Sequence, residues 1–124
     1  QGYSTSVGDE GGFAPDLKDS DEALQLIVNA VQKAGYAPGN DVMIAIDAAA
    51  SELYEESRNV YYFPGESRQC GKTVFRDTAE MVAYYEELIE KYPIVSIEDG
   101  LCEDDFEGWK QIAISQSKTT SSRR

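Results

Sequence analysis

The sequence contains no histidine and only two cysteines, Cys70 and Cys102, in 124 residues. Without histidine, this chain alone cannot form a serine–histidine–aspartate triad. The two cysteines have neither the CxxC spacing of a zinc site nor the number needed for a disulfide framework. No hydrophobic run approaches the roughly 20 residues that span a membrane. These absences argue against a triad hydrolase, a zinc protein and a membrane-spanning protein.

Basic residues are also scarce, with 11 Lys and Arg against 23 Asp and Glu and a net charge of −12. Nucleic acids and anionic membranes both require a basic surface, so neither is an expected partner. The hydrophobic fraction of 41% is typical of a globular chain. The chain begins Gln1-Gly2-Tyr3-Ser4, without a methionine or a signal peptide, which we interpret as an interior point of a longer protein.

Three helices are predicted, each beginning at an acidic cap. The predicted capping pairs are Asp19 with Glu22, Asp77 with Glu80, and Asp104 with Glu107. The first helix should cover 20–34 and end at Gly35. The second should carry an apolar stripe between 81 and 92 and end at Pro93, and the third should carry Trp109 and Ile112.

Strands are predicted over 3–8, 42–46 and 94–97, with a hairpin between 60–63 and 73–75. The apolar runs at 42–46 and 94–97 are typical of strands buried on both faces of a parallel sheet. A buried helix segment is the alternative for 42–46, but the run is short and flanked by turn residues, which favours a strand.

Alternating strands and helices predict an α/β fold with parallel strands. About three consecutive strand–helix units cannot close an eight-stranded barrel, so we predict a fragment of a larger TIM-like barrel. We assign 1–114 to this partial barrel domain. The polar segment 115–124 is predicted to be a disordered tail, with a non-native remnant as the alternative.

Three carboxylates stand at equivalent places, because Glu10, Asp47 and Glu98 each follow a predicted strand. In α/β barrels the active site is built at the carboxyl ends of the strands, so these acids are predicted to converge. Magnesium prefers oxygen ligands, and Asp47 and Glu98 on neighbouring strands could hold such an ion. The alternative is that each acid is a solvated strand terminus.

Three segments resemble the enolase family in the same order. The first is Val7–Pro15 (VGDEGGFAP), the second is Ile46–Tyr54 (IDAAASELY), and the third is Ser96–Leu101 (SIEDGL) followed by Glu103–Lys110 (EDDFEGWK). Glycine at position 100 is closer to bacterial-type enolases than to the animal form, which has proline there. The similarity covers roughly 3–111, which is most of the chain.

This resemblance implies the reversible dehydration of 2-phosphoglycerate to phosphoenolpyruvate in glycolysis, with Mg²⁺. It implies that Asp47 and Glu98 are metal ligands and that Glu10 is catalytic, assisting departure of the hydroxide. The family's third metal ligand and its catalytic lysine lie on later strands that are absent from this sequence. We interpret Lys72, Lys91 and Lys110 as surface lysines, so the isolated chain is predicted to be inactive.

The resemblance further implies a cytoplasmic homo-oligomer, with a cell-surface or secreted location known in the family. One alternative is a truncated, non-catalytic enolase-like protein that acts by binding, as in plasminogen-type interactions. Another is a related acid-sugar dehydratase, although those proteins do not generally carry the DEGGFAP loop.

Overall fold

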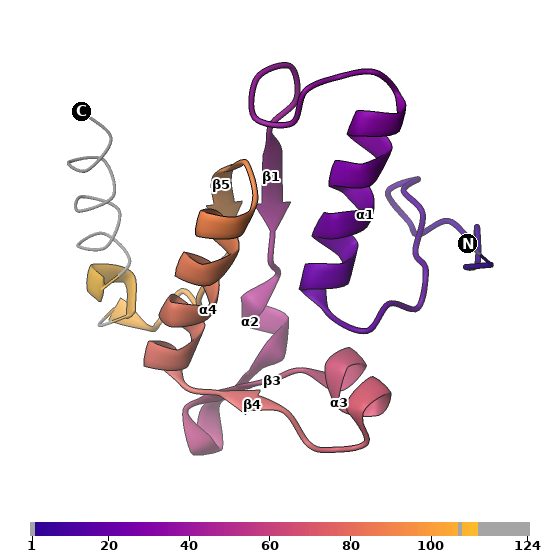
Figure 1. Ribbon diagram of the computed structural model, residues 1–124. Helices are drawn as coiled ribbons and strands as arrows, with labels where there is room; N and C mark the ends of the chain where they lie inside the picture. The colour runs from indigo at the N-terminus through magenta and orange to yellow at the C-terminus, as the bar shows by residue number, and fades with distance from the viewer. Residues whose placement is uncertain (1, 107, 112–124) are drawn as a thin grey trace.

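The computed structural model describes residues 2–106 and 108–111. Two long helices, α1 (Ser20–Lys33) and α4 (Thr78–Lys91), accompany a parallel pair of strands, β1 (Ile44–Asp47) and β5 (Ile94–Glu98). Figure 1 shows a smaller unit below them, which contains β3 (Val60–Tyr62), β4 (Phe75–Arg76) and α3 (Pro64–Cys70). The order of helices and strands confirms the predicted α/β class.

Both long helices begin and end as their sequences predict. The Asp19 side chain accepts a hydrogen bond from the Glu22 backbone N–H, and α1 ends at Lys33, followed by the cap residue Ala34 and by Gly35 at a φ of 88°. The Glu22 side chain, however, accepts from Lys18 N rather than Asp19 N, so the predicted capping box is only half formed. In α4 the complete capping box forms at Asp77, which stabilises the helix start by about 1 kcal/mol.

The core consists of two clusters that share α4. One cluster joins α1, β1 and the end of α4 through Leu24, Ile44, Leu88 and Tyr92. The other joins α4 to the small sheet that contains β3 and β4, and it consists of Ala50, Tyr61, Met81, Tyr85 and Leu101. Because the apolar stripe of α4 contributes to both clusters, this helix fixes the parallel strands relative to the small sheet.

The predicted hairpin forms, and the structure adds elements that the sequence did not indicate. β3 pairs antiparallel with β4, as expected, and also with β2 (Tyr54–Glu55). α2 (Ala50–Leu53) and the short 3₁₀ helix Glu56–Arg58 lie on either side of β2, and α3 lies inside the predicted hairpin loop. These elements have two to seven residues each, too few to display an apolar period.

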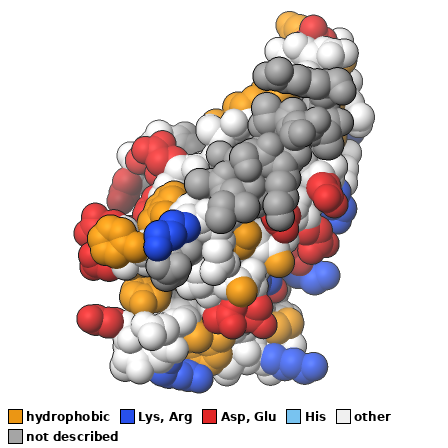
Figure 2. All heavy atoms as spheres, turned by 90° about the vertical axis from the view of Figure 1, so that its left-hand side faces the viewer, with side chains coloured by type: hydrophobic (Ala, Val, Ile, Leu, Met, Phe, Trp, Pro, Cys, Tyr) orange, Lys and Arg blue, Asp and Glu red, His pale blue; other side chains and the backbone are white. Residues whose placement is uncertain are grey.

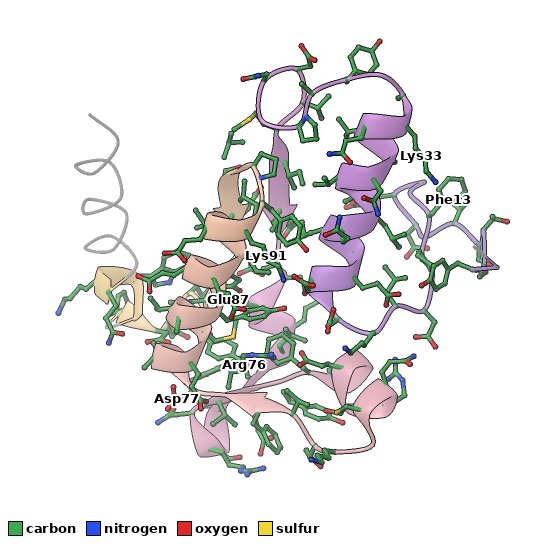
Figure 3. All side chains as sticks on the ribbon, in the orientation of Figure 1. Phe13, Lys33, Arg76, Asp77, Glu87 and Lys91 are labelled. Atoms are coloured by element: carbon green, nitrogen blue, oxygen red, sulfur yellow. The ribbon has the colours of Figure 1, made fainter. Side chains whose placement is uncertain are left out.

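Arg76 connects α3, β4 and α4 (Figure 3). Its guanidinium donates to both Glu66 carboxylate oxygens at 3.0 Å and lies 4.2–4.3 Å from the centres of the Phe63 and Tyr84 rings. Burial alone would lower the pKa of Arg76, but the Glu66 carboxylate outweighs it and the pKa is raised. The charge is therefore retained in this partly buried place.

Three sequence predictions are corrected. No described residue between 3 and 6 pairs in a sheet, and Val7 forms only an isolated bridge with Phe13, so the strand at 3–8 is absent. β1 and β5 are not buried on both faces, since Val95 is 59% exposed and Ala45 is exposed. A strand needs neighbours and a covering layer, and the described chain supplies the parallel pair with cover on one face only.

The third correction concerns the predicted cap of the last helical segment, in which residues 106 and 108–111 are helical. Asp105, not Asp104, caps it, because Asp105 Oδ1 accepts from Gly108 N at 3.0 Å and Asp105 O accepts from Trp109 N. Ile112 and Glu107 fall outside the described residues, as does the predicted tail at 115–124.

Candidate site at the ends of the parallel strands

Asp47 and Glu98 are the last residues of β1 and β5, and they occupy paired positions in the register of the two parallel strands. Both residues are exposed. Side chains at paired positions of adjacent strands point to the same face of a sheet. The two carboxylates therefore lie next to each other at one sheet edge, as the sequence predicts.

The loops that follow the two strands are hydrogen bonded to each other. Ala48 N donates to Glu98 O at 2.9 Å, and Ala50 N donates to Asp99 O at 2.8 Å. Asp47 Oδ1 accepts from Ala49 N at 3.2 Å. Among the described residues, no hydrogen bond or ion pair engages the Glu98 carboxylate. Within the described residues, Asp47 thus binds its own loop through Oδ1 and keeps Oδ2 available to a ligand, as the Glu98 carboxylate is.

Two residues of these loops adopt left-handed backbone conformations. Ala49 has a φ of 46° and Asp99 a φ of 45°. Such values cost a non-glycine residue about 1–2 kcal/mol, although Asp is tolerated better than Ala. The turns direct Ala49 N toward the Asp47 carboxylate and bring Asp99 opposite Ser51, whose hydroxyl donates to Asp99 Oδ1 at 2.7 Å.

Sequence reasoning assigned no role to Asp99 or Ser51. Their contact joins residues 48 positions apart and depends on the register of β1 with β5. The available signal was the second acid of the Glu98–Asp99 pair, because Asp at a strand end favours local hydrogen bonding and left-handed turns.

Glu10 is not brought to this edge. It lies in an exposed turn closed by hydrogen bonds between Gly8 and both Gly11 and Gly12. In the shared orientation of Figures 1 and 3, Phe13, at the end of this turn, lies on one side of α1 and β1 lies on the other. The predicted convergence of three acids is therefore observed for Asp47 and Glu98 only.

All three acids are exposed. Two surface hollows, one beside α1 and one beside α4, include none of the three candidate residues. On the face shown in Figure 2, the Lys and Arg side chains are scattered among acidic and uncharged surface. Within the described residues, no set of three or more His, Cys, Asp or Glu side chains is grouped as a metal site.

The two carboxylates at the strand ends fit a magnesium ion that takes its remaining ligands from water, substrate or other protein groups. Mg²⁺ is commonly held by one or two carboxylates, with water and substrate oxygens as its other ligands. Asp47 and Glu98 provide two hard oxygen donors from adjacent strands.

In the part of the chain that the structure describes, no helix combines the length and apolarity needed to cross a membrane.

Comparison with known proteins identifies the family. The sequence matches the enolase C-terminal TIM barrel domain over residues 1–120. It is 58% identical over 112 residues to the enolase of Natranaerobius thermophilus, covering 90% of this chain and 24% of that protein. The chain thus spans about a quarter of the length of this curated relative. The domain match over nearly the whole sequence, together with this identity, shows that the chain belongs to the enolase family and is part of its C-terminal TIM barrel domain.

Proposed function

We propose that this chain provides part of the active site of an enolase, which interconverts 2-phosphoglycerate with phosphoenolpyruvate and water. The observation that carries the proposal is the register of β1 with β5, which pairs Asp47 with Glu98 at the carboxyl ends of two parallel strands. Active sites of α/β barrels lie at those strand ends. The family membership supplies the reaction.

Asp47 and Glu98 are proposed to hold Mg²⁺. Bound Mg²⁺ would supply positive charge that stabilises the negative charge developing on the substrate carboxylate during proton removal. The chain's own contribution is to present two carboxylates from a hydrogen-bonded framework rather than from flexible loops. Such preorganisation limits the movement that the ligands would need on metal binding.

Glu10 is proposed to assist departure of the C3 hydroxyl of 2-phosphoglycerate. Hydroxide is a poor leaving group, so a carboxylic acid that protonates it lowers the barrier. The support for this role is the match of the DEGGFAP loop to the family. A left-handed Gly11, with a φ of 85°, lets the chain turn sharply directly after Glu10.

The isolated 124-residue chain is proposed to lack useful turnover. By family resemblance, the third metal ligand and the lysine that removes the proton are not in this sequence. Loss of a general base alone reduces rates by about 10²–10⁴-fold. A homo-oligomeric, cytoplasmic enolase is the corresponding proposal for the natural protein that contains this sequence.

Glu98→Gln in the natural protein tests the proposal. The change keeps the size of the side chain and removes its charge, so Mg²⁺ affinity and enolase turnover should both fall by at least about tenfold. Glu90→Gln is the matched control, because Glu90 is exposed on α4 and away from the strand ends. Affinity and turnover should be unchanged in the control.

Wild-type Mg²⁺ affinity and turnover in Glu98→Gln would overturn the assignment of this site. A separate assay of the 124-residue chain with 2-phosphoglycerate and Mg²⁺ tests its inactivity. Turnover near that of an intact enolase would contradict the proposed need for residues outside this sequence.

A further inference from the structure

We propose that Asp99 is a positioning residue that fixes the spacing and orientation of Asp47 and Glu98 by clamping the loop after β1 to the loop after β5. The inference rests on the proposed role of Asp47 and Glu98 as ligands of Mg²⁺. It adds a residue that is not itself a ligand but acts through the two that are.

The clamp consists of side-chain and backbone contacts from one residue to the opposite loop. Asp99 Oδ1 accepts from Ser51 Oγ at 2.7 Å, and Asp99 Oδ2 lies 3.4 Å from Ser51 N. The Asp99 carbonyl accepts from Ala50 N at 2.8 Å. Both ends of Asp99, its carboxylate and its carbonyl, are therefore engaged with the segment that follows β1.

These contacts determine where the Asp47 carboxylate points. Asp47 Oδ1 accepts from Ala49 N, and Ala49 is held in a left-handed conformation between two tethered neighbours. Ala48 N is bound to Glu98 O and Ala50 N to Asp99 O. Without the side-chain contacts of Asp99 to Ser51, this side of Ala49 would be held by the bond from Ala50 N to Asp99 O alone, so the partner of the Asp47 carboxylate, Ala49 N, would be less firmly placed.

The clamp is anchored in the core on the β5 side. Gly100 follows Asp99 and is buried, and its carbonyl accepts from the buried Tyr85 hydroxyl of α4 at 2.7 Å. A side chain at Gly100 would meet Ile97 at 3.3 Å and the Tyr85 ring at 3.5 Å, so the backbone lies directly against the core. The loop that carries Asp99 is thus fixed by the core, and the segment that follows Asp47 is held to that loop.

The contacts also distinguish Asp99 from a third metal ligand. Both of its carboxylate oxygens face Ser51, and the described residues contain no group of three metal-binding side chains. A ligand would need a free oxygen directed toward the ion. Groups that orient ligands through hydrogen bonds typically change metal affinity by about 10–100-fold when removed.

The test compares Ser51→Ala with Ser57→Ala in the natural protein. Ser51→Ala removes the hydroxyl that binds Asp99 and leaves every carboxylate in place, so Mg²⁺ affinity measured by calorimetric titration should fall about tenfold. Ser57 is the matched control, since its exposed hydroxyl donates to Glu55 at 3.3 Å and it lies in the 3₁₀ helix Glu56–Arg58, outside the contacts between the two loops. Ser57→Ala should bind Mg²⁺ as the wild type does.

Two variants of Asp99 itself separate positioning from simple structural support. Asp99→Ala should weaken Mg²⁺ binding at least as much as Ser51→Ala. Asp99→Asn keeps an acceptor for the Ser51 hydroxyl and tolerates the left-handed backbone, so its Mg²⁺ affinity should lie between those of Asp99→Ala and the wild type. Thermal unfolding in the presence of a chelator shows whether the metal-free fold has changed.

The outcomes distinguish this inference from the function on which it rests. Loss of affinity in Glu98→Gln with wild-type affinity in Ser51→Ala and Asp99→Ala would overturn the positioning role and leave the metal site intact. Wild-type affinity in Glu98→Gln as well would overturn the metal site. A lower metal-free melting temperature with unchanged Mg²⁺ affinity would assign Asp99 a structural role only.

Discussion

Tyr61→Phe should loosen the contact between the small sheet and the loop after β5. Tyr61 is fully buried, and its hydroxyl accepts from Cys102 N at 2.9 Å and donates to Asp105 Oδ2 at 3.2 Å. Burial raises the pKa of Tyr61 far above its ordinary value, so the hydroxyl stays protonated at any working pH. The single oxygen therefore serves one donor and one carboxylate at the same time.

The expected cost follows from these two partners. Removing the oxygen leaves the partly buried Cys102 N without its acceptor, and an unpaired N–H away from water costs about 1–3 kcal/mol. Asp105 keeps hydrogen bonds from the Thr78 hydroxyl and Gly108 N, so its loss is partly compensated. The contributions overlap, and we expect about 2–3 kcal/mol in total.

Hydrogen exchange, resolved by mass spectrometry and compared between the natural protein and its Tyr61→Phe variant, measures this loss of local stability. Peptides covering 60–62 and 101–105 should exchange about 30- to 150-fold faster, since each 1.4 kcal/mol is a factor of ten. Tyr54→Phe is the matched control, because the Tyr54 ring lies 5.1 Å from that of Tyr61 but its hydroxyl donates to the exposed Asn59. Equal acceleration in both variants would refute the reasoning.

Three further predictions concern the fold. Met81→Ala, at a fully buried position, should lower the free energy of unfolding by about 2–5 kcal/mol in a urea titration, and a loss below 1 kcal/mol would contradict its place in the core. Ala49→Gly should leave stability unchanged or raise it by up to about 1 kcal/mol, because glycine tolerates the φ of 46°, whereas Ala48→Gly should lower it. Lys91 donates to Asp21 at 2.6 Å and lowers the pKa of that carboxyl, so this contact stabilises the fold above about pH 4 and the stabilisation is lost as the pH falls further. Asp21→Asn should thus differ from the wild type in unfolding experiments at pH 6 and approach it near pH 2, and a constant difference would show that the ion pair is not responsible.

Local signals explain why α1 and α4 could be predicted from the sequence. Asp19 and Asp77 each cap a helix through a backbone N–H three residues away, and Gly35 ends α1 through its own left-handed conformation. Such interactions involve neighbours in sequence and need no knowledge of the fold. The same applies to β1 and β5, whose apolar runs end in acids.

The failures involve information that is not local. Residues 3–8 have the composition of a strand, yet Ser6 O accepts from Ala14 N and Val7 pairs with Phe13, so the segment folds onto its own loop. The cap of the last helical segment moved by one residue because Asp105, unlike Asp104, is also held by Tyr61. Asp104 and Asp105 are equally suitable caps by sequence, and the tertiary contact with Tyr61 favours Asp105.

The candidate site likewise has features that the sequence could predict and features that it could not. The pairing of Asp47 with Glu98 was predictable, because parallel strands place their carboxyl ends at one edge. The position of Glu10 was not, since it depends on a strand that the described chain does not form. The Ser51–Asp99 contact could not be predicted either, because it appears only when the register aligns the two loops.

The pairing of two carboxylates also has an electrostatic consequence. Asp47 and Glu98 carry like charges at adjacent positions, which repel each other in a chain that is already strongly acidic. The backbone bonds from Ala48 and Ala50 to the opposite loop hold the two strand ends together despite that repulsion. Under the proposed function, a divalent cation would replace the repulsion with attraction to both carboxylates. Under the same proposal, the hydrogen bonds between the loops would keep the two carboxylates in the geometry that the cation requires, so the residues that make these bonds would serve the function as well as the fold.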